Sequence, residues 1–461
     1  MPPNCNRSLA QVAAELQADT EQSLIFERFL PAEEIKKVCR EMGHSYRDRI
    51  YGPVITIWMF LGQTLSPDHS CRDAVHRLNA WRVEHSKPKA DSNTTAYCGA
   101  RQRLPEAVVA ELARRSGRHC QQTADSNWRW KGRNVKLADG TTMTMPDTIE
   151  NQKEYPQQRG QLKGCGFPIM RCVMLFCLGT GAVLDIAMAP YRGKQTGENS
   201  LLQAIIRLLF PGDILLADRY YATFANIHRA YREGYDVVMR VHHKRKVDFR
   251  KGYKQGACDQ IVAYLKPACR PVWMSAEDYA DLDAFVLVRH LRYTVHQKGF
   301  RVRFLVLATT LLDASKYSVQ DLADLYAQRW QVELDIRSLK THMQMEHLRC
   351  QSPSMVRKEI YAHLISYNLI RDLIVRAAVR YSTSPNCLSH TGAMQALNAF
   401  SEKLQTGCDR LAALEEALLE SISEHPVGDR KPRIHPREIK RRPKQYKLMN
   451  RPRHAARRPV A

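Results

Sequence analysis

The sequence predicts an α/β protein in which a mixed β-sheet flanked by helices is preceded and followed by helical regions. Apolar residues recur at helical spacing from residue 1 to about 125, and from about 133 this spacing gives way to short apolar segments typical of strands. From there to residue 242 the expected order is strand, strand, strand, helix, strand, helix, strand. Helical spacing returns after residue 316. These three observations indicate the fold class.

The first part of the chain is expected to be a helical domain. Its last segment divides into two helices at Leu104-Pro105, because proline cannot continue the helix that precedes it. Arg101, Arg103 and Arg114 would form a basic face on these two helices, which favours a DNA-binding domain, although small helical domains with basic faces are common without that function. The apolar spacing places the helices of this domain at 8–20, 27–43, 51–65, 71–85 and 91–115.

The central part is expected to supply the sheet. The turn Gly179-Thr180-Gly181 joins two of its strands as a hairpin, and Pro211-Gly212 closes a helix. The segment from 242 to 316 looks like a separate β-rich insertion with strands at 260–266, 284–295 and 302–310. The sheet itself is expected to contain strands at 134–140, 167–179, 182–191, 213–218 and 235–242, with helices at 197–210 and 223–234.

After the insertion the chain returns to helices. Ser318 with Asp321 three residues later predicts a capping box at the start of a helix that continues through Lys340. Further helices are expected at 354–381 and within 389–424. The predicted domains are a helical domain 1–125, a core 126–345 with the insertion 242–316, a helical region 346–424 and a flexible basic tail 425–461.

Charge is the strongest global signal. The chain has 70 basic and 47 acidic residues, a formal charge of +23. Residues 429–461 hold 13 Lys or Arg against 2 acids, so 13 − 2 = +11 of this charge lies there. Such a surplus favours a polyanionic partner, above all nucleic acid, whose condensed counterions are released on binding. A basic protein without such a partner is the alternative, and the basic face of the domain 1–125 is open to both interpretations.

Cysteine usage and hydropathy bear on the compartment. The 13 cysteines form no CxxC pair, so neither a zinc site nor a redox motif is indicated, and the thiols are expected to be reduced. No signal peptide is expected, because the first 16 residues lack a continuous apolar segment. No apolar run reaches the ~18 residues of a membrane helix. We expect a cytoplasmic protein without membrane contact.

One helix carries a lone acid among cations. Wound at about 3.6 residues per turn, residues 326–340 place one carboxylate in an arc of roughly 80° with three cations and a phenol. Beside this arc lies an apolar stripe, and the remaining polar residues are expected to face solvent. The arc comprises Tyr326, Arg329, Glu333, Arg337 and Lys340, and the solvent-facing set comprises Gln328, Gln331, Asp335 and Ser338.

Glu333 has two further acids as candidate partners. Asp139 and Asp218 each stand at the end of a predicted buried strand, where ligand sites of open sheets gather. Three carboxylates without histidine or cysteine suit hard cations, and two Mg²⁺ ions about 4 Å apart can promote an in-line phosphoryl displacement. Taken singly, a strand-end aspartate is more often a turn residue, and a glutamate beside arginine is more often an exposed ion pair.

The order and spacing of these residues carry a resemblance. The segments ADGTTMTMPDT around Asp139 and ILLADRYYATF around Asp218, with the spacing Tyr326-x2-Arg329-x3-Glu333-x6-Lys340, are similar to the insertion sequence 4 family of DDE transposases over residues 130 to 350. The resemblance implies an RNase H-like core with a β-strand insertion between the second and third acids. The strand order expected above agrees with that core.

The resemblance also implies roles for residues. Asp139 would bridge two Mg²⁺ ions, for which Mn²⁺ would substitute, while Asp218 and Glu333 would each complete one metal site. Tyr326, Arg329 and Lys340 would hold DNA phosphates, so the cations would face DNA instead of pairing with Glu333. Two weaker DNA-binding candidates are Arg219, which is equally suited to a local salt bridge, and Trp273, which would stack on an unpaired base or belong to the core.

The expected activity is that of a transposase. It would bind the terminal inverted repeats of an insertion sequence in double-stranded DNA, cleave at the ends and join them to target DNA. Two ends held together require a homodimer or a higher assembly, and the compartment would be the prokaryotic cytoplasm at the nucleoid. Two alternatives stay open: a DNA nuclease of the same fold that cuts without joining, and a catalytically silent DNA-binding regulator.

Overall fold

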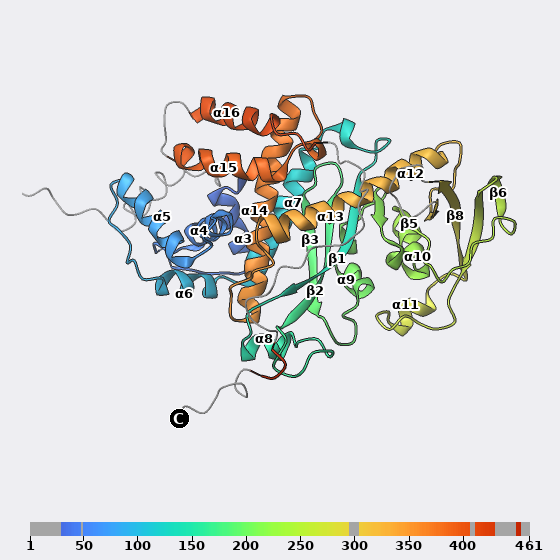
Figure 1. Ribbon diagram of the computed structural model, residues 1–461, viewed down its shortest axis with the longest axis horizontal. Coiled ribbons are helices and arrows are strands. Elements are labelled where there is room, and N and C mark those ends of the chain that lie inside the picture. The colour runs from blue at the N-terminus through green and yellow to red at the C-terminus, as the bar shows by residue number, and fades with distance from the viewer. Residues whose placement is uncertain (1–28, 48, 295–303, 406–410, 429–448, 453–461) are drawn as a thin grey trace, which may run out of the picture. The chain divides into compact units, whose positions relative to one another are not determined.

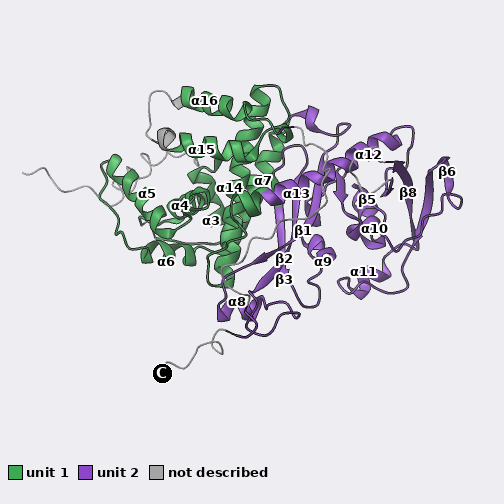
Figure 2. Cartoon of the chain, viewed as in Figure 1, with its two compact units in different colours: residues 1–124, 182–184, 338–427 green, residues 125–181, 185–337, 428–461 purple. Residues whose placement is uncertain are grey.

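The computed structural model describes residues 29–47, 49–294, 304–405, 411–428 and 449–452 (Figure 1). The predicted helix 8–20 and nearly all of the tail 429–461 lie outside these residues. The chain forms two compact units (Figure 2). Unit 1 comprises residues 1–124, 182–184 and 338–427, and unit 2 comprises residues 125–181, 185–337 and 428–461.

Unit 2 is organised by a nine-stranded mixed sheet in the order β3-β2-β1-β4-β5-β9-β8-β7-β6. β1 is antiparallel to β2 and parallel to β4, and β4 is parallel to β5. The first five strands therefore have the order 3-2-1-4-5, which agrees with the expected RNase H-like core. The strands are β1 (Val135–Thr144), β2 (Ile169–Cys177), β3 (Val183–Pro190), β4 (Ile214–Ala217), β5 (Asp236–Arg240), β6 (Tyr253–Gly256), β7 (Asp259–Leu265), β8 (Phe285–Thr294) and β9 (Phe304–Thr309).

Helices cover the sheet of unit 2. α9 packs on β2, α10 and α12 pack on both β5 and β8, and α13 packs on β1. The short helices α8 and α11 and the strand β6 were not expected from the sequence, since each has six residues or fewer and too few apolar positions to show a period. The helices of this unit are α8 (Ile149–Glu154), α9 (Glu198–Ile205), α10 (Phe224–Glu233), α11 (Ala276–Ala280), α12 (Val319–Ala327) and α13 (Gln331–Arg337).

β1 is longer than predicted. It continues to Thr144 because β2 pairs with it along its whole second half, with Asp139 opposite Met174. Asp139 therefore lies in the middle of a strand and not at its end, as the sequence had suggested. What ends after Ala138 is the parallel pairing with β4, whose last paired residue is Ala217.

The β-rich insertion is part of the sheet and not a separate body. β9 pairs antiparallel with β5, and β8, β7 and β6 follow in turn. An edge strand at β5 would expose unpaired backbone N–H and C=O groups, and the insertion satisfies them by adding strands at that edge. The interpretation of 242–316 as a separate segment was wrong in this respect.

Unit 1 is built around one long helix. α14 (Pro353–Arg380) is buried along most of its length and packs against α4, α7, α15 and α16. Buried residues lie on nearly every side of it, as expected for a helix surrounded by others, and they include polar side chains such as Lys358, Asn368 and Arg371. The other helices of this unit are α3 (Ala32–Glu41), α4 (Pro53–Leu65), α5 (Cys71–Glu84), α6 (Thr95–Arg103), α7 (Glu106–Gln122), α15 (His390–Gln405) and α16 (Leu411–Ser423).

The predicted basic face of α6 and α7 is only partly present. The two helices do separate at Leu104-Pro105. Arg101, however, is only 7% exposed, and its guanidinium lies 5.0 Å from the ring centroid of Phe60 and 4.9 Å from that of Tyr97. Arg101 therefore belongs to the core of unit 1, where the two rings and hydrogen bonds to Gln63 and Cys71 offset part of the cost of burying the cation.

The helix expected to run through residues 326–340 is irregular. Ser318 and Asp321 do form the predicted capping box at the start of α12. A 3₁₀ turn at Gln328–Trp330 then separates α12 from α13, and a π-helical turn follows at Ser338–His342. Asp335 is fully buried and Ser338 is 6% exposed, so the predicted solvent face was wrong for these two residues, while Gln328 is exposed and Gln331 is half-buried. Tighter and wider turns rotate later side chains away from the positions that a uniform helix would give them.

Among the described residues, no helix has the length and apolar character needed to cross a membrane.

Candidate active site

The register of two parallel strands brings the predicted aspartates together. Ala138 of β1 and Ala217 of β4 are paired, and Asp139 and Asp218 are the next residues on the two strands. Neighbouring strands lie about 4.8 Å apart. Both aspartates therefore occupy the same level of the sheet, at the point where β4 ends. Asp218 accepts a hydrogen bond from the backbone N–H of Arg219 at 2.6 Å.

Glu333 reaches the same region from a helix. α13 packs on β1, and the carboxylates of Glu333 and Asp218 both raise the pKa of Asp139 through electrostatic repulsion. Asp218 and Glu333 thus both lie within electrostatic range of Asp139 in unit 2. The three acids come from a strand, a strand end and a helix that are 79 and 115 residues apart in the chain.

Arg329 pairs with Glu333. Its Nη2 lies 2.9 Å from Oε1 of Glu333, an ion pair one helical turn apart. The expectation that the cations avoid Glu333 and face only DNA was wrong for Arg329. The spacing i, i+4 places the two side chains on one face, and in the protein alone the guanidinium neutralises the carboxylate.

Burial sets the protonation of Asp139. Desolvation raises its pKa to about 6, and the hydrogen bond from the Gly140 N–H, 2.8 Å from Oδ1, together with Arg329, opposes that shift. Repulsion from Glu333 and Asp218 adds to it. A half-buried carboxyl group beside two other acids is a favourable position for a cation, since a positive charge offsets the repulsion among them.

The donor set suits Mg²⁺, although the side chains do not form a closed cage. The three groups are carboxylates, the hard oxygen ligands that Mg²⁺ prefers, and Mg²⁺ commonly takes only one or two protein carboxylates. Over the residues that the structure describes, no group of three or more His, Cys, Asp or Glu side chains is close enough to hold one metal ion. The residues fit the ion by ligand chemistry, but in this structure the described side chains do not converge on one ion position.

Tyr326 is a buried residue close to Asp218 and Arg329. It is 7% exposed, and burial raises its pKa to about 12, with Asp218 adding to the shift and Arg329 and Arg240 opposing it. The guanidinium of Arg329 lies 5.9 Å from its ring centroid. Tyr326 thus supports Arg329 and stands close to Asp218. Lys340 lies in the π-helical turn Ser338–His342, within unit 1.

The weaker DNA-binding candidates lie at exposed or partly exposed places in unit 2. Arg219 is exposed directly after Asp218. Trp273 is half-buried in the turn before α11. Of its two predicted roles, a core position is therefore only partly met, and stacking on a base stays a prediction. Two exposed aromatic residues beside DNA-binding candidates were not predicted: Tyr220, 48% exposed after Arg219, and Trp330, 49% exposed after Arg329.

A fourth acid beside the three was also missed. Glu198, the first residue of α9, lies so close to Gly140 that a Cβ atom there would be 2.5 Å from its Cδ. Burial raises the pKa of Glu198, Asp218 raises it further, and the neighbouring Arg171 and Tyr221 side chains oppose the shift. Gly140, the residue after Asp139, was the feature of the sequence that could have indicated this acid, because a glycine beside a candidate site residue often allows a close neighbour.

In this mixed sheet, acids from two adjacent parallel strands meet an acid from a covering helix. Sites with such grouped acids support metal-dependent phosphoryl transfer. Residues 130–369 match the family described as transposase DDE domain. The chain therefore belongs to the DDE transposases, in the insertion sequence 4 family.

Two curated relatives come from Escherichia coli (strain K12). Transposase InsG for insertion sequence element IS4 is 24% identical over 424 residues, which cover 91% of this chain and 92% of the relative. Putative transposase InsZ is 27% identical over 203 residues, which cover 43% of this chain and 64% of the relative. A solved structure, the piggyBac transposase synaptic complex with hairpin DNA, is 10% identical and covers 86% of this chain and 84% of its own, with a TM-score of 0.43.

Proposed function

We propose that this transposase binds the terminal inverted repeats of its element, cleaves the DNA at the element's ends and joins those ends to target DNA. One observation carries the proposal: Asp139 and Asp218 follow paired residues of adjacent parallel strands, and the Glu333 carboxylate on α13 interacts electrostatically with Asp139. A site of this kind serves hydrolysis and strand transfer alike, because both are in-line displacements at phosphorus.

Two Mg²⁺ ions, or Mn²⁺ in their place, would neutralise charge on the reacting phosphodiester and lower the pKa of the attacking water or 3′-hydroxyl. Asp139 would hold both ions, and Asp218 and Glu333 would each hold one. With Glu333 holding an ion, Arg329 would be free of its ion pair and available to a DNA phosphate. Arg219 would bind a phosphate beside these acids, Lys340 of unit 1 would bind a DNA phosphate, and Tyr326 would keep Arg329 in position.

The partners follow from this chemistry. The substrate is double-stranded DNA, both at the element's ends and at the target, and a formal charge of +23 supports binding to a polyanion. Two ends must be cut in concert, so the working form would be a homodimer or a higher assembly on DNA. We place the protein in the prokaryotic cytoplasm, at the nucleoid.

One experiment separates this function from its alternatives. Purified protein is incubated with duplex DNA that carries the element's ends, a target plasmid and either Mg²⁺, Mn²⁺ or EDTA. Cleavage followed by joining supports the proposal. Cleavage without joining would instead identify a nuclease, and binding without cleavage would identify a silent regulator.

The site assignment has its own test. Asp139→Asn, Asp218→Asn and Glu333→Gln should each reduce cleavage by at least about 10³-fold, because removing one group of a unit that acts together abolishes most of the rate. DNA binding in EDTA should stay unchanged. Asp185→Asn, on β3 in the same sheet, serves as the matched control and should retain cleavage. A variant of the three that cleaved at a near-normal rate would remove that residue from the site.

A further inference from the structure

Unit 1 contains a buried cation without an ion-pair partner among the described residues. Arg101 on α6 is 7% exposed, and no Asp or Glu of the described chain forms an ion pair with it. Its Nη1 donates to Oε1 of Gln63 at 3.3 Å, and its Nε has no hydrogen-bond partner in the same part of the chain. Glu359 acts on it electrostatically but accepts hydrogen bonds from the backbone N–H groups of Arg349 and Cys350. Burying a cation without a counter-charge is costly, so nearby groups that can ionise gain importance.

Two thiols lie against the guanidinium group of Arg101. Its Nη2 donates to Sγ of Cys71 at 3.0 Å and to Sγ of Cys98 at 3.6 Å. Two sulfur atoms in contact with one nitrogen atom are necessarily close to each other. Burial raises the pKa of Cys71, the Cys98 thiol raises it further, and Arg101 opposes the shift. The two thiols therefore interact with each other as well as with the arginine.

The two cysteines come from neighbouring helices. Cys71 is the first residue of α5 and Cys98 lies within α6, and these helices pack on each other. Cys71 also packs against a buried cluster that includes Trp81 of α5 and Tyr97 of α6. Both cysteines are half-buried, so a small molecule can reach them while the core stays folded. The fold thus keeps a partly accessible thiol pair in one place.

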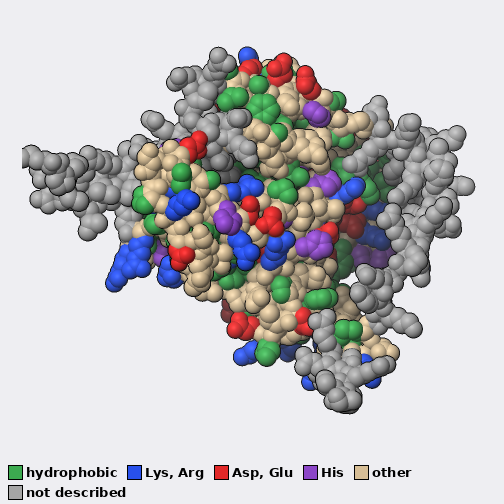
Figure 3. All heavy atoms as spheres, turned by 60° about the vertical axis from the view of Figure 1, so that its left-hand side comes forward, with side chains coloured by type: hydrophobic (Ala, Val, Ile, Leu, Met, Phe, Trp, Pro, Cys, Tyr) green, Lys and Arg blue, Asp and Glu red, His purple; other side chains and the backbone are tan. Residues whose placement is uncertain are grey.

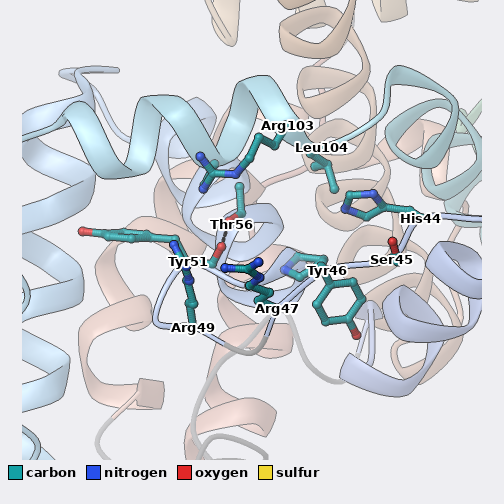
Figure 4. Close-up of a pocket in the computed structure, with 12 residues that line it drawn as sticks. His44, Ser45, Tyr46, Arg47, Arg49, Tyr51, Thr56, Arg103 and Leu104 are labelled. Carbon is teal, nitrogen blue, oxygen red and sulfur yellow. Dashed lines mark hydrogen bonds between the residues drawn. The ribbon is translucent and has the colours of Figure 1, made fainter.

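The other arginine near the end of α6 has a different environment. Arg103 is exposed and lines the cavity beside the start of α4 (Figure 4). The described residues that line this cavity include no cysteine. Of these two arginines of α6, only Arg101 combines burial with contacts to two thiols.

Two features favour the thiolate form of Cys71. The guanidinium of Arg101 supplies a positive charge, and the first N–H groups of α5 add the partial positive charge of a helix start. The thiolate is the form of cysteine that reacts with oxidants. A partly exposed cysteine beside a cation and a second thiol has the arrangement of a redox-sensitive pair. Cys71 is therefore expected to react first, and Cys98 to close the disulfide.

The surface near these helices suits a small oxidant. Figure 3 turns forward the side of the molecule that carries α5 and α6 in Figure 1, and on its described part basic, acidic and hydrophobic side chains lie interspersed. A protein oxidant would need a broad apolar patch and a charged one would be guided by a field of one sign. A small neutral molecule such as hydrogen peroxide needs neither.

We propose that Cys71 and Cys98 form a modification site at which hydrogen peroxide produces a reversible disulfide between α5 and α6. The inference does not depend on the proposed function. The Cys71 thiolate attacks a peroxide oxygen, so that an S–O bond forms, the O–O bond breaks, and the leaving hydroxide takes up the proton that Cys71 had released. The Cys98 sulfur then attacks the sulfenic sulfur, so that the S–S bond forms, the S–O bond breaks, and hydroxide leaves with the Cys98 proton as water. Two thiols are oxidised, and one peroxide is reduced to two waters.

Mass spectrometry tests the pairing. Full-length protein is reduced with dithiothreitol, freed of it and treated with hydrogen peroxide, and the remaining thiols are blocked with N-ethylmaleimide. Proteolysis without reduction should give a peptide pair joined through Cys71 and Cys98, and dithiothreitol should separate it. A link from Cys71 to Cys350 in its place would overturn the pair. Oxidation confined to the exposed Cys269 and Cys387 would overturn the site.

Single variants test the order of the two steps. In Cys98→Ser the sulfenic acid at Cys71 has no second thiol to attack it, so dimedone should label Cys71. In Cys71→Ser the same dose of peroxide should leave Cys98 unlabelled. Equal labelling of the remaining thiol in the two variants would refute the assigned roles.

The matched control is Cys387→Ser, which removes an exposed thiol of unit 1 and should leave the link between Cys71 and Cys98 intact. Loss of the link in this control would mean that Cys387 takes part and that the pair is wrong. If Cys98→Ser or Cys71→Ser does not fold, the presence or absence of the link in the unmodified protein still decides the proposal.

Discussion

At the scale of single residues, Asp139 combines burial with two like charges, and this has a measurable consequence for stability. Its pKa rises from 3.8 to about 6, so the folded protein binds the proton more tightly than the unfolded chain does. Stability is therefore lost as the pH rises from about 4 through 6, and the loss is complete above that range.

We expect Asp139→Asn to remove this penalty. In EDTA at pH 7.5 the variant should be more stable than the unmodified protein by on the order of 2 kcal/mol, and near pH 4 the two should agree. Melting temperatures across this range provide the measurement. Mg²⁺ should raise the melting temperature of the unmodified protein at pH 7.5 but not that of the variant, because ligation stabilises only a folded state that can bind. A constant difference between the two proteins from pH 4 to 7.5 would contradict the assignment.

The close approach of Glu198 to Gly140 gives a second prediction. Gly140→Ala puts a Cβ 2.5 Å from Cδ of Glu198, so the carboxyl group must move within a site already rich in negative charge. Cleavage should fall by roughly 10- to 100-fold, as small displacements near reacting groups commonly cause. In a Glu198→Ala background the same change should cost little, because the obstructing group is gone. Equal losses in both backgrounds would show that the glycine acts without Glu198.

These residues show what the sequence could and could not predict. Asp139, Asp218 and Glu333 were identifiable because three acids with a distinctive spacing near Glu333 are visible in the chain itself. Glu198 was not, since its position depends on how α9 packs on β2. The ion pair between Arg329 and Glu333 was predictable from their i, i+4 spacing, but the resemblance led us to expect Arg329 to contact DNA instead.

At the scale of elements, long apolar segments were predictable and irregular ones were not. β2, β4 and α14 follow the predicted ranges closely because their side chains are buried along most of their length. The helical stretch from Ser318 to His342 was predicted as uniform, but a 3₁₀ turn and a π-helical turn interrupt it. Such turns depend on tertiary contacts that a single period cannot express. The pairing of β9 with β5 likewise joins residues far apart in the chain, so the period of a single segment could not predict it.

The insertion contains a buried ion pair that is expected to stabilise it. Arg289 of β8 is fully buried, donates to Oδ1 of Asp259 on β7 at 2.8 Å and also donates to the Tyr317 carbonyl at 2.7 Å. Arg289→Met leaves an uncompensated buried carboxylate, which costs about 3–5 kcal/mol. Thermal unfolding should show this loss.

Two comparisons make that prediction specific. Asp259→Leu/Arg289→Met should recover part of the lost stability, because no charge is then left buried. Arg250→Met breaks the pair with Asp248, in which the arginine side chain is 87% exposed, and it should leave the melting temperature unchanged. Equal losses for Arg250→Met and Arg289→Met would mean that burial does not decide the strength of these pairs.

At the scale of the whole molecule, charge is distributed unevenly along the chain. Residues 429–461 carry +11 of the total +23, while the described helices of unit 1 hold many of their cations in ion pairs. A segment so rich in Lys and Arg is expected to bind phosphates and to release counterions, whatever its conformation in the free protein. It would then contribute affinity without sequence preference.

Removal of residues 429–461 tests this contribution. The shortened protein should bind element-end DNA more weakly, with a slope of log K against log[salt] lower by about 0.9 for each phosphate that this segment neutralises in the full-length protein. The preference for element-end over unrelated duplex should stay the same or increase, because binding to phosphates strengthens both complexes alike. Replacing all 13 Lys and Arg of this segment by Gln, with its length kept, should match the truncation. An unchanged slope in either protein would mean that this segment does not touch DNA and that its charge serves another purpose.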